Sequence, residues 1–229
     1  MEHKMIKRAS LWIFPLLFAW CVALCTSANV ASADELTAGT SPEVLPVTEE
    51  TVDTALIAKA EAKLEKCETL IDKIREDAKR LDKKKARTRY LKLKERVGYL
   101  KSACSGKDYM TQYWNDAKKL RSKGKKLLKK IDKGLSSQRR AASHLRFHGV
   151  VYSGGRRYTW YSQNVLPGGG LSIPGRHVGN GGLVMDKNCY VCVASSDHSR
   201  GTVLKTPYGL AKVYDCGCPY GTVDVYTNW

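Results

Sequence analysis

The C-terminal part of the chain has few carboxyl groups, and these are its candidates for acid–base chemistry. The segment 147–229 contains no glutamate, and its only carboxylates are Asp186, Asp197, Asp215 and Asp224. Asp215 and Asp224 lie nine positions apart, on either side of a Gly-containing turn sequence. Protonation of a glycosidic or ester oxygen calls for such a group. The alternative is that these aspartates only accept hydrogen bonds from the backbone in turns.

Four cysteines accompany the two closely spaced aspartates: Cys189, Cys192, Cys216 and Cys218. In an oxidising compartment they would form two disulfides, and the preferred pairing is Cys192 with Cys218 and Cys189 with Cys216. Zinc is the alternative, because Cys-x-x-Cys is a common half of a zinc site, and free thiols are a third. The Cys-x-Cys half is too tight for the usual zinc knuckle, so we expect disulfides, no metal and no cofactor.

The residues around these groups predict a small all-β domain over 147–229. Fourteen of the 19 glycines lie between positions 149 and 221, among short runs of Val, Tyr and Thr. The predicted strands are 150–153, 157–161, 190–194, 202–205, 211–214 and 223–227. Thr206-Pro-Tyr-Gly209 predicts a turn between the fourth and fifth of these strands. A compact barrel would hide the strand edges, and the segment 167–182, with seven glycines, is expected to be a long loop.

The preceding region, 51–146, predicts helices of coiled-coil type, so the fold class of the chain is α+β. Proline is absent from 51–135, and apolar residues recur at intervals of three and four in three successive runs, beginning at Ile57, Tyr90 and Met110. The first two runs are out of phase across 82–88, which predicts a break there. Ser105-Gly106 predicts a second break. Self-association through these helices is possible.

Two further cysteines, Cys67 and Cys104, lie on the apolar faces of the first two predicted helices. Their midpoint falls within the predicted break, where residues equidistant from a hairpin tip face each other. We therefore expect a Cys67–Cys104 disulfide in an exported protein, with two buried free thiols as the alternative.

The N-terminal residues predict export. A short basic segment is followed by an apolar tract at 11–25 and by Val30-Ala-Ser-Ala33, which together have the pattern of a signal peptide over 1–33 cleaved near Ala33. An uncleaved anchor fits less well, because a membrane span takes about 20 apolar residues. Residues 34–50 predict a polar, disordered linker. The mature protein is therefore expected to be secreted.

The positive charge is concentrated in one part of the chain. The whole sequence carries 39 Lys+Arg and 22 Asp+Glu, and residues 101–146 alone carry 14 basic and three acidic residues. Such a segment is expected to bind anionic cell-envelope polymers or lipid headgroups. A solvated helix face is the alternative, and nucleic acid is disfavoured because the aromatic residues of single-strand binding surfaces are missing.

The C-terminal motifs resemble those of the 3D domain family, which is named for three aspartates. The similar segments are Tyr158-Thr-Trp-Tyr161, Val193-Ala194, Gly201-Thr-Val203, Gly209–Val213, Asp215-Cys-Gly217 and Gly221-Thr-Val-Asp224-Val-Tyr226. The resemblance implies a double-psi β-barrel like those of membrane-bound lytic transglycosylase A and the stationary-phase muralytic proteins, with expansin-like proteins more distant. The implied activity is cleavage of peptidoglycan glycan strands that leaves a 1,6-anhydro end, and the implied location of the secreted protein is the cell wall.

The resemblance also implies roles for the aspartates. Asp224 matches the catalytic acid, and Asp215 matches the middle aspartate, although the loop between them is two residues shorter than in the family. The first aspartate should follow Val-Ala directly. Here either Asp197 reaches the site through a rebuilt turn, which we favour, or Ser195 and Ser196 replace the acid. We expect a raised pKa for Asp224, caused by repulsion from Asp215 and by desolvation from its neighbours.

The same motifs supply candidate substrate-binding residues: Tyr158, Thr159, Trp160 and Tyr220. Aromatic rings such as these can stack on sugar faces. His177 and His198 are expected to be ordinary loop residues. Two further functions are compatible with the sequence: a non-catalytic, expansin-like protein that binds cell-wall glycan, and an extracellular binder of nucleic acid or another polyanion.

Overall fold

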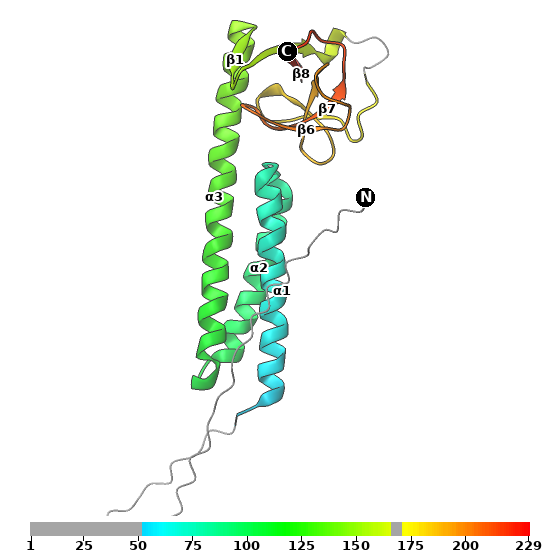
Figure 1. Cartoon of the computed structure of the whole chain (residues 1–229). Helices are drawn as coiled ribbons and strands as arrows, with labels where there is room; N and C mark the ends of the chain where they lie inside the picture. The colour runs from blue at the N-terminus through cyan, green and yellow to red at the C-terminus, as the bar shows by residue number, and fades with distance from the viewer. Residues whose placement is uncertain (1–51, 166–170) are drawn as a thin grey trace, which may run out of the picture. The chain divides into compact units, whose positions relative to one another are not determined.

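The computed structural model describes residues 52–165 and 171–229 of the chain. The predicted signal peptide (1–33) and linker (34–50) lie outside the described residues. The described part consists of three helices followed by eight strands, which confirms the α+β class (Figure 1). No helix in these two ranges has both the length and the apolarity needed to cross a membrane.

The three long helices are α1 (Thr54–Lys79), α2 (Lys83–Cys104) and α3 (Thr111–His148). Asp53 and Asp82 cap α1 and α2, since each carboxylate accepts a hydrogen bond from a backbone N–H three residues later. After α2, a short 3-10 helix at Asp108–Met110 leads into α3, as the Ser105-Gly106 break predicted.

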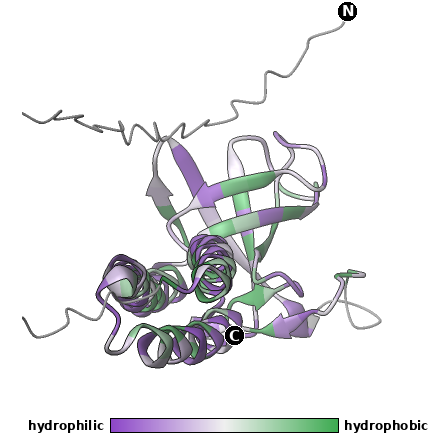
Figure 2. Cartoon of the chain, turned by 90° about the horizontal axis from the view of Figure 1, so that it is seen from below, coloured by the Kyte–Doolittle hydropathy of each residue, from purple (hydrophilic) through white to green (hydrophobic). Residues whose placement is uncertain are grey.

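The helices pack against one another as a three-helix bundle, seen end-on in Figure 2. Their apolar positions form one buried cluster, which includes Cys67, Ile74, Leu93, Leu100, Ala117 and Ile131. Glycine allows close approach at one point, because a Cβ on Gly124 of α3 would lie 2.9 Å from side-chain atoms of Tyr90 and Leu93 of α2. The bundle therefore buries the apolar faces that the sequence pattern predicted.

The first break lies earlier than predicted, at Arg80–Asp82 instead of 82–88. Leu81 forms the tip with a positive φ of 57°, a conformation that favours glycine, so the residue types give no sign of the turn. Its side chain packs on Gly134 of α3, where a Cβ would overlap Cδ2 of Leu81.

This earlier turn makes the expected Cys67–Cys104 disulfide wrong. Cys67 lies 12 residues before the end of α1, whereas Cys104 lies 21 residues after the start of α2. With a helical rise of about 1.5 Å per residue, this difference in distance from the turn separates the two cysteines by about 14 Å along the bundle axis. Disulfide-bonded Cα atoms lie within about 7 Å. Both thiols are free and buried.

All six predicted strands are present, and two short strands were missed. The eight strands are β1 (Val151–Ser153), β2 (Arg156–Ser162), β3 (His177–Val178), β4 (Val184–Met185), β5 (Val191–Ala194), β6 (Val203–Thr206), β7 (Gly209–Asp215) and β8 (Thr222–Thr227). The missed strands, β3 and β4, have two residues each. β6 and β7 form the predicted hairpin, in which Thr206 pairs with Gly209.

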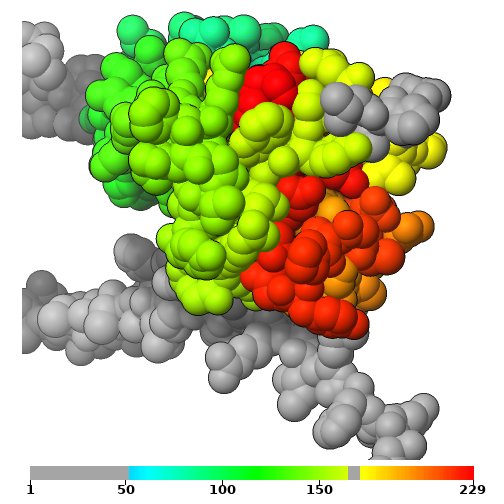
Figure 3. All heavy atoms as spheres, turned by 90° about the horizontal axis from the view of Figure 1, so that it is seen from above, coloured from blue at the N-terminus to red at the C-terminus, as the bar shows by residue number. Residues whose placement is uncertain are grey.

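The eight strands form one open sheet. Its main path runs β1-β2-β8-β5-β4-β3, and β7 joins β5 to β6. Two pairs, β2 with β8 and β5 with β7, are parallel. The parallel β2–β8 pair brings the end of the chain beside residues that follow α3, and Figure 3 shows these segments adjoining at the surface. A strand that closely follows α3 thus meets the last strand of the chain.

The core of the sheet includes the last turns of α3. Ala142 and Leu145 are fully buried in the same cluster as Tyr158, Val193 and Val225. α3 itself runs to His148, past the expected boundary at 146. The helix is therefore part of the β-domain as well as of the bundle.

Candidate functional site

Four residues from different strands follow one another across the centre of the sheet. Thr159 of β2 pairs with Asp224 of β8, and Ala194 of β5 pairs with both Asp224 and Asp215 of β7. Directly paired residues project to the same face of a sheet, so Thr159, Asp224 and Ala194 share a face. The register shifts at a β-bulge between Val193 and Ala194, and a hydrogen bond from Tyr226, two residues after Asp224, ties Asp215 to this face. We call the series Thr159, Asp224, Ala194, Asp215 the aspartate row, which holds the two aspartates that the sequence singled out.

Asp224 is half-buried within the row and hydrogen-bonded. Thr159 Oγ1 donates to Asp224 Oδ1 at 2.6 Å. Burial raises the pKa of the Asp224 carboxyl above its ordinary value, while the Thr159 hydrogen bond and the positive charge of Arg157 lower it by less. The expected direction is therefore confirmed. The expected contribution of Asp215 is not found, because burial alone accounts for the increase.

Asp215 has a different environment at the other end of the row. Its Oδ1 accepts hydrogen bonds from Arg200 at 3.0 Å and from the backbone N–H of Cys216 at 2.9 Å. Its Oδ2 accepts from the hydroxyl of Tyr226 at 3.3 Å. A guanidinium, a backbone amide and a phenol thus hold the Asp215 carboxyl group in place. Asp215 is fixed at the far end of the row from Thr159, with Ala194 between it and Asp224.

Tyr226 lies between the two aspartates. Burial raises the pKa of its hydroxyl, and the negative charges of Asp215 and Asp224 raise it further. The phenol therefore stays protonated and can only donate to Asp215. Tyr161 of β2 packs against Tyr226, with ring centroids 6.4 Å apart, and is 38% exposed. Tyr161 is therefore a candidate contact residue for a ligand at the row.

Asp197 lies outside the aspartate row, and its expected part in the site remains a prediction. Asp197 lies in an exposed loop, where its Oδ2 accepts a hydrogen bond from the backbone N–H of Gly221 at 2.8 Å. It therefore holds the turn before β8 and does not lie in the row. The residue next to Ala194 is Ser195, which is fully buried and lies 3.1 Å from Nδ1 of His198 through its hydroxyl oxygen.

The serine and aspartate residues near the row otherwise have structural contacts. Ser196 Oγ donates to the carbonyl oxygen of Cys216 at 2.6 Å. Asp186, the fourth aspartate, is buried and accepts from the backbone N–H groups of Asn188 and Tyr190 and from the hydroxyl of Tyr214. Asp186 thus satisfies local donors, as aspartates in turns commonly do.

Of the four predicted substrate-binding residues, only Thr159 lies in the row. Tyr158 is 2% exposed and packs edge-on against Tyr208 in the core, so it cannot stack on a ligand. Trp160 also packs against the core, with its ring 6.1 Å from that of Trp229. Both residues alternate with Thr159 along β2 and project to the opposite face. Tyr220 is 83% exposed, in the turn before β8.

The four C-terminal cysteines are free thiols in this structure. Cys192 and Cys218 pack in the same cluster, so their expected pairing remains a prediction. Cys189 lies instead against Asp82 at the tip of the helical hairpin, while Cys216 is exposed. Burial raises the pKa of Cys189 to about 11. Within residues 52–165 and 171–229, no group of three or more potential ligands could hold a metal ion.

Comparisons with protein-family models, with curated proteins and with solved structures found no match to this chain.

Proposed function

We propose that this chain is a secreted enzyme that cleaves peptidoglycan glycan strands in the manner of a lytic transglycosylase, with Asp224 as its proton donor. One observation carries the proposal: Asp224, whose pKa burial raises, accepts a hydrogen bond from Thr159 and lies in the same row as Asp215. A carboxyl group with a raised pKa near a second carboxyl group is the arrangement that glycan cleavage uses.

The chemistry requires only one acid. Asp224 donates its proton to the glycosidic oxygen as the C1–O bond of the sugar breaks. The resulting carboxylate then takes the proton from the C6 hydroxyl of the same sugar, whose oxygen bonds to C1 and gives the 1,6-anhydro product. No water enters, so no second carboxylate is needed to activate one. The negative charge of Asp215 is available to stabilise the positive charge that develops on the sugar ring.

The strand pairing supports the double-psi barrel implied by the resemblance to the 3D family. A domain of this size built only from hairpins would have antiparallel pairs throughout. Here β2 pairs in parallel with β8 and β5 with β7, and both parallel pairs contribute to the aspartate row. Crossed connections of this kind bring motifs distant in sequence into one site. In this proposal, export follows signal cleavage near Ala33, and the substrate is the cell wall.

The proposal is tested by digesting purified sacculi with the protein and analysing the released muropeptides by mass spectrometry. We expect 1,6-anhydro products from the native chain and none from Asp224→Asn. Asp72→Asn, which removes an exposed carboxylate from α1, is the control and should retain activity. If native protein releases no anhydro product yet still sediments with sacculi, the enzyme is excluded and the expansin-like binding function stands.

A further inference from the structure

The strongest unassigned feature of the molecule is the charge of two of its three helices. α1 carries six basic and six acidic residues and is neutral as a whole. α2 carries nine basic residues and one acidic residue, and α3 carries twelve and two. The positive charge therefore belongs to the side of the bundle where α2 and α3 meet. The sequence pattern assigned it to 101–146 only, because six acidic residues in 34–53, a range with no basic residue, offset the charge of α2 in a count over 34–100.

A groove lies between α2 and α3 on this side. Its volume is about 490 Å³, and it is lined by Tyr90, Lys94, Lys118, Arg121, Ser122 and Lys125. Four of the six lining residues are cations, and none is a carboxylate. The three cations of α3 follow one another by one turn each, which places them about 5 Å apart along the helix axis. The groove is thus a linear array of positive charges with a hydroxyl group beside it.

The floor of this groove is rigid. Gly124 is buried, and a Cβ at this position would lie 2.9 Å from Cδ2 of Tyr90. The Tyr90 ring therefore packs on the bare backbone of α3. Close packing at this point fixes the spacing between Lys94 on one wall and the cations of α3 on the other.

The cations of the groove are available to a ligand. Across the part of the chain that the structure describes, Lys94, Arg121 and Lys125 form no ion pair, and Lys118 lies over the ring of Trp114 at 5.2 Å. All four side chains are exposed. Their mutual repulsion is uncompensated within the protein, and a polyanion would relieve it.

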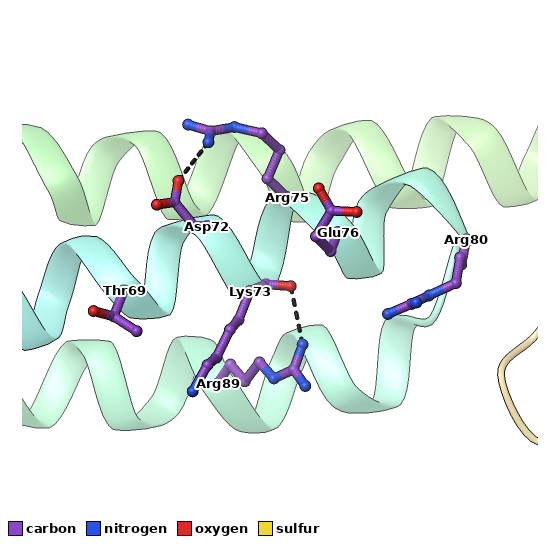
Figure 4. Close-up of a pocket in the computed structure, with 7 residues that line it drawn as sticks. All are labelled: Thr69, Asp72, Lys73, Arg75, Glu76, Arg80 and Arg89. Atoms are coloured by element: carbon purple, nitrogen blue, oxygen red, sulfur yellow. Dashed lines mark hydrogen bonds and ion pairs between the residues drawn. The ribbon is translucent and has the colours of Figure 1, made fainter. Parts of the chain in front are cut away.

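The hollow between α1 and α2 provides a contrast (Figure 4). It also contains cations, but carboxylates accompany them. Arg75 pairs with Asp72, and Arg89 pairs with Asp77 at 2.5 Å and with the Lys73 carbonyl oxygen at 2.9 Å. Arg80 also pairs with Asp77, so Lys73 is the one cation of this lining without an ion pair among the described residues. The α1–α2 hollow therefore has less unpaired positive charge than the α2–α3 groove.

We propose that the α2–α3 groove binds a linear polymer of phosphodiesters joined by small polyols. A narrow groove accepts one flexible chain, whereas a flat membrane surface would touch only the ridges on either side. Single-stranded nucleic acid, the form that could enter such a groove, would require aromatic rings free to stack on bases. The one aromatic residue of the lining, Tyr90, is held against Gly124. Repeated phosphates with small, non-aromatic linkers match both the charge and the shape.

The test is a fluorescence anisotropy titration of the full chain with a labelled oligomer of poly(glycerol phosphate), repeated over a range of salt concentrations. The variant combines Lys94→Gln, Lys118→Gln, Arg121→Gln and Lys125→Gln. Its control removes the same number of exposed charges elsewhere, through Lys59→Gln, Lys66→Gln, Lys123→Gln and Lys130→Gln. Circular dichroism checks that both proteins retain their helices.

We expect the affinity of the groove variant to fall on the order of a hundredfold at about 0.1 M salt. In a plot of the logarithm of the binding constant against the logarithm of the salt concentration, its slope should become less steep by about 3, because each of the four lost phosphate contacts contributes about 0.7. The control should change affinity by about twofold. Equal losses in both variants would overturn the proposal in favour of diffuse attraction. Tighter binding to an oligothymidylate of equal charge, or to phosphatidylglycerol vesicles, would overturn it in favour of nucleic acid or membrane.

Discussion

At the scale of single residues, one hydroxyl sets the properties of the proposed proton donor. Thr159 holds Asp224 by a short hydrogen bond, and that bond lowers the pKa of Asp224 against the larger effect of burial. A carboxyl group with a raised pKa in the folded state makes folding less favourable when it is ionised. Its contribution to stability is therefore present below the ordinary pKa of aspartic acid and is lost as the pH rises through the folded-state pKa.

Thr159→Val tests this balance. Without the hydroxyl, the pKa of Asp224 should rise further, so the loss of stability with increasing pH should extend to higher pH. The pKa is measured by NMR titration of the side-chain carboxyl carbon, and the stability by denaturant unfolding across the same pH range. Thr88→Val, on the exposed side of α2, is the control and should leave the Asp224 titration unchanged. A lower pKa for Asp224 in Thr159→Val would contradict the assigned role of the hydrogen bond.

The alternation of side chains along β2 is enough to sort the candidate residues of that strand. If Thr159 faces Asp224, then Tyr158 and Trp160 must face the other way, and Tyr161 must share the face of Thr159. The sequence-based prediction instead grouped three consecutive residues in one site. The hydrogen bond itself joins residues 65 positions apart and depends on the parallel β2–β8 register, which no local pattern encodes.

At the scale of elements, the long periodic segments were predictable and the short or unmarked ones were not. The three helices and six strands follow from repeating apolar positions and from turn residues. β3 and β4 have two residues each, too few to show a period. The α1–α2 turn was misplaced because Leu81, a residue that disfavours a positive φ, stands where glycine would normally mark the break.

The packing of Leu81 on α3 can be tested with two glycines. Helix propensity alone predicts that Gly→Ala inside a helix stabilises by about 1 kcal/mol. Gly98 in α2 has no atom within 4 Å of a Cβ position, so Gly98→Ala should show this gain. In Gly134→Ala the new Cβ would overlap Cδ2 of Leu81, so the Leu81 side chain must give up its packing on α3 and the protein should lose roughly 1–3 kcal/mol.

The measurement is the free energy of unfolding of both variants by denaturant titration. The two substitutions are chemically identical and both lie inside helices, so the difference in sign isolates the contact with Leu81. Stabilisation of similar size in both variants would mean that the tip does not pack on Gly134 as the structure has it.

At the scale of the whole molecule, α3 joins the two halves into one compact unit. Gln138, which is buried, donates to the carbonyl oxygen of Tyr208 at 2.6 Å and accepts from Asn180 at 3.0 Å. Arg146 lies over the ring of Trp229 at 5.8 Å. Composition changes near position 147, which is why the sequence predicted a boundary there. The packing crosses that position, because apolar residues of α3 complete the core of the sheet.

Two fragments of the chain test whether the change in composition near position 147 is also the start of an independently folding domain. The fragment 147–229 lacks Gln138, Ala142 and Leu145, whereas 135–229 retains all three. Burial of a leucine contributes about 2 kcal/mol, and the alanine and the glutamine hydrogen bonds add to it. We therefore expect 147–229 to be less stable than 135–229 by roughly 3–4 kcal/mol, measured by denaturant unfolding and by the dispersion of amide NMR signals. Leu145→Ala in the longer fragment should reproduce most of that loss of stability. Equal stability of the two fragments would place the folding boundary at 147.

Because the strands that carry Asp224 and Asp215 surround the core that α3 completes, the proposed site should form only in the longer fragment.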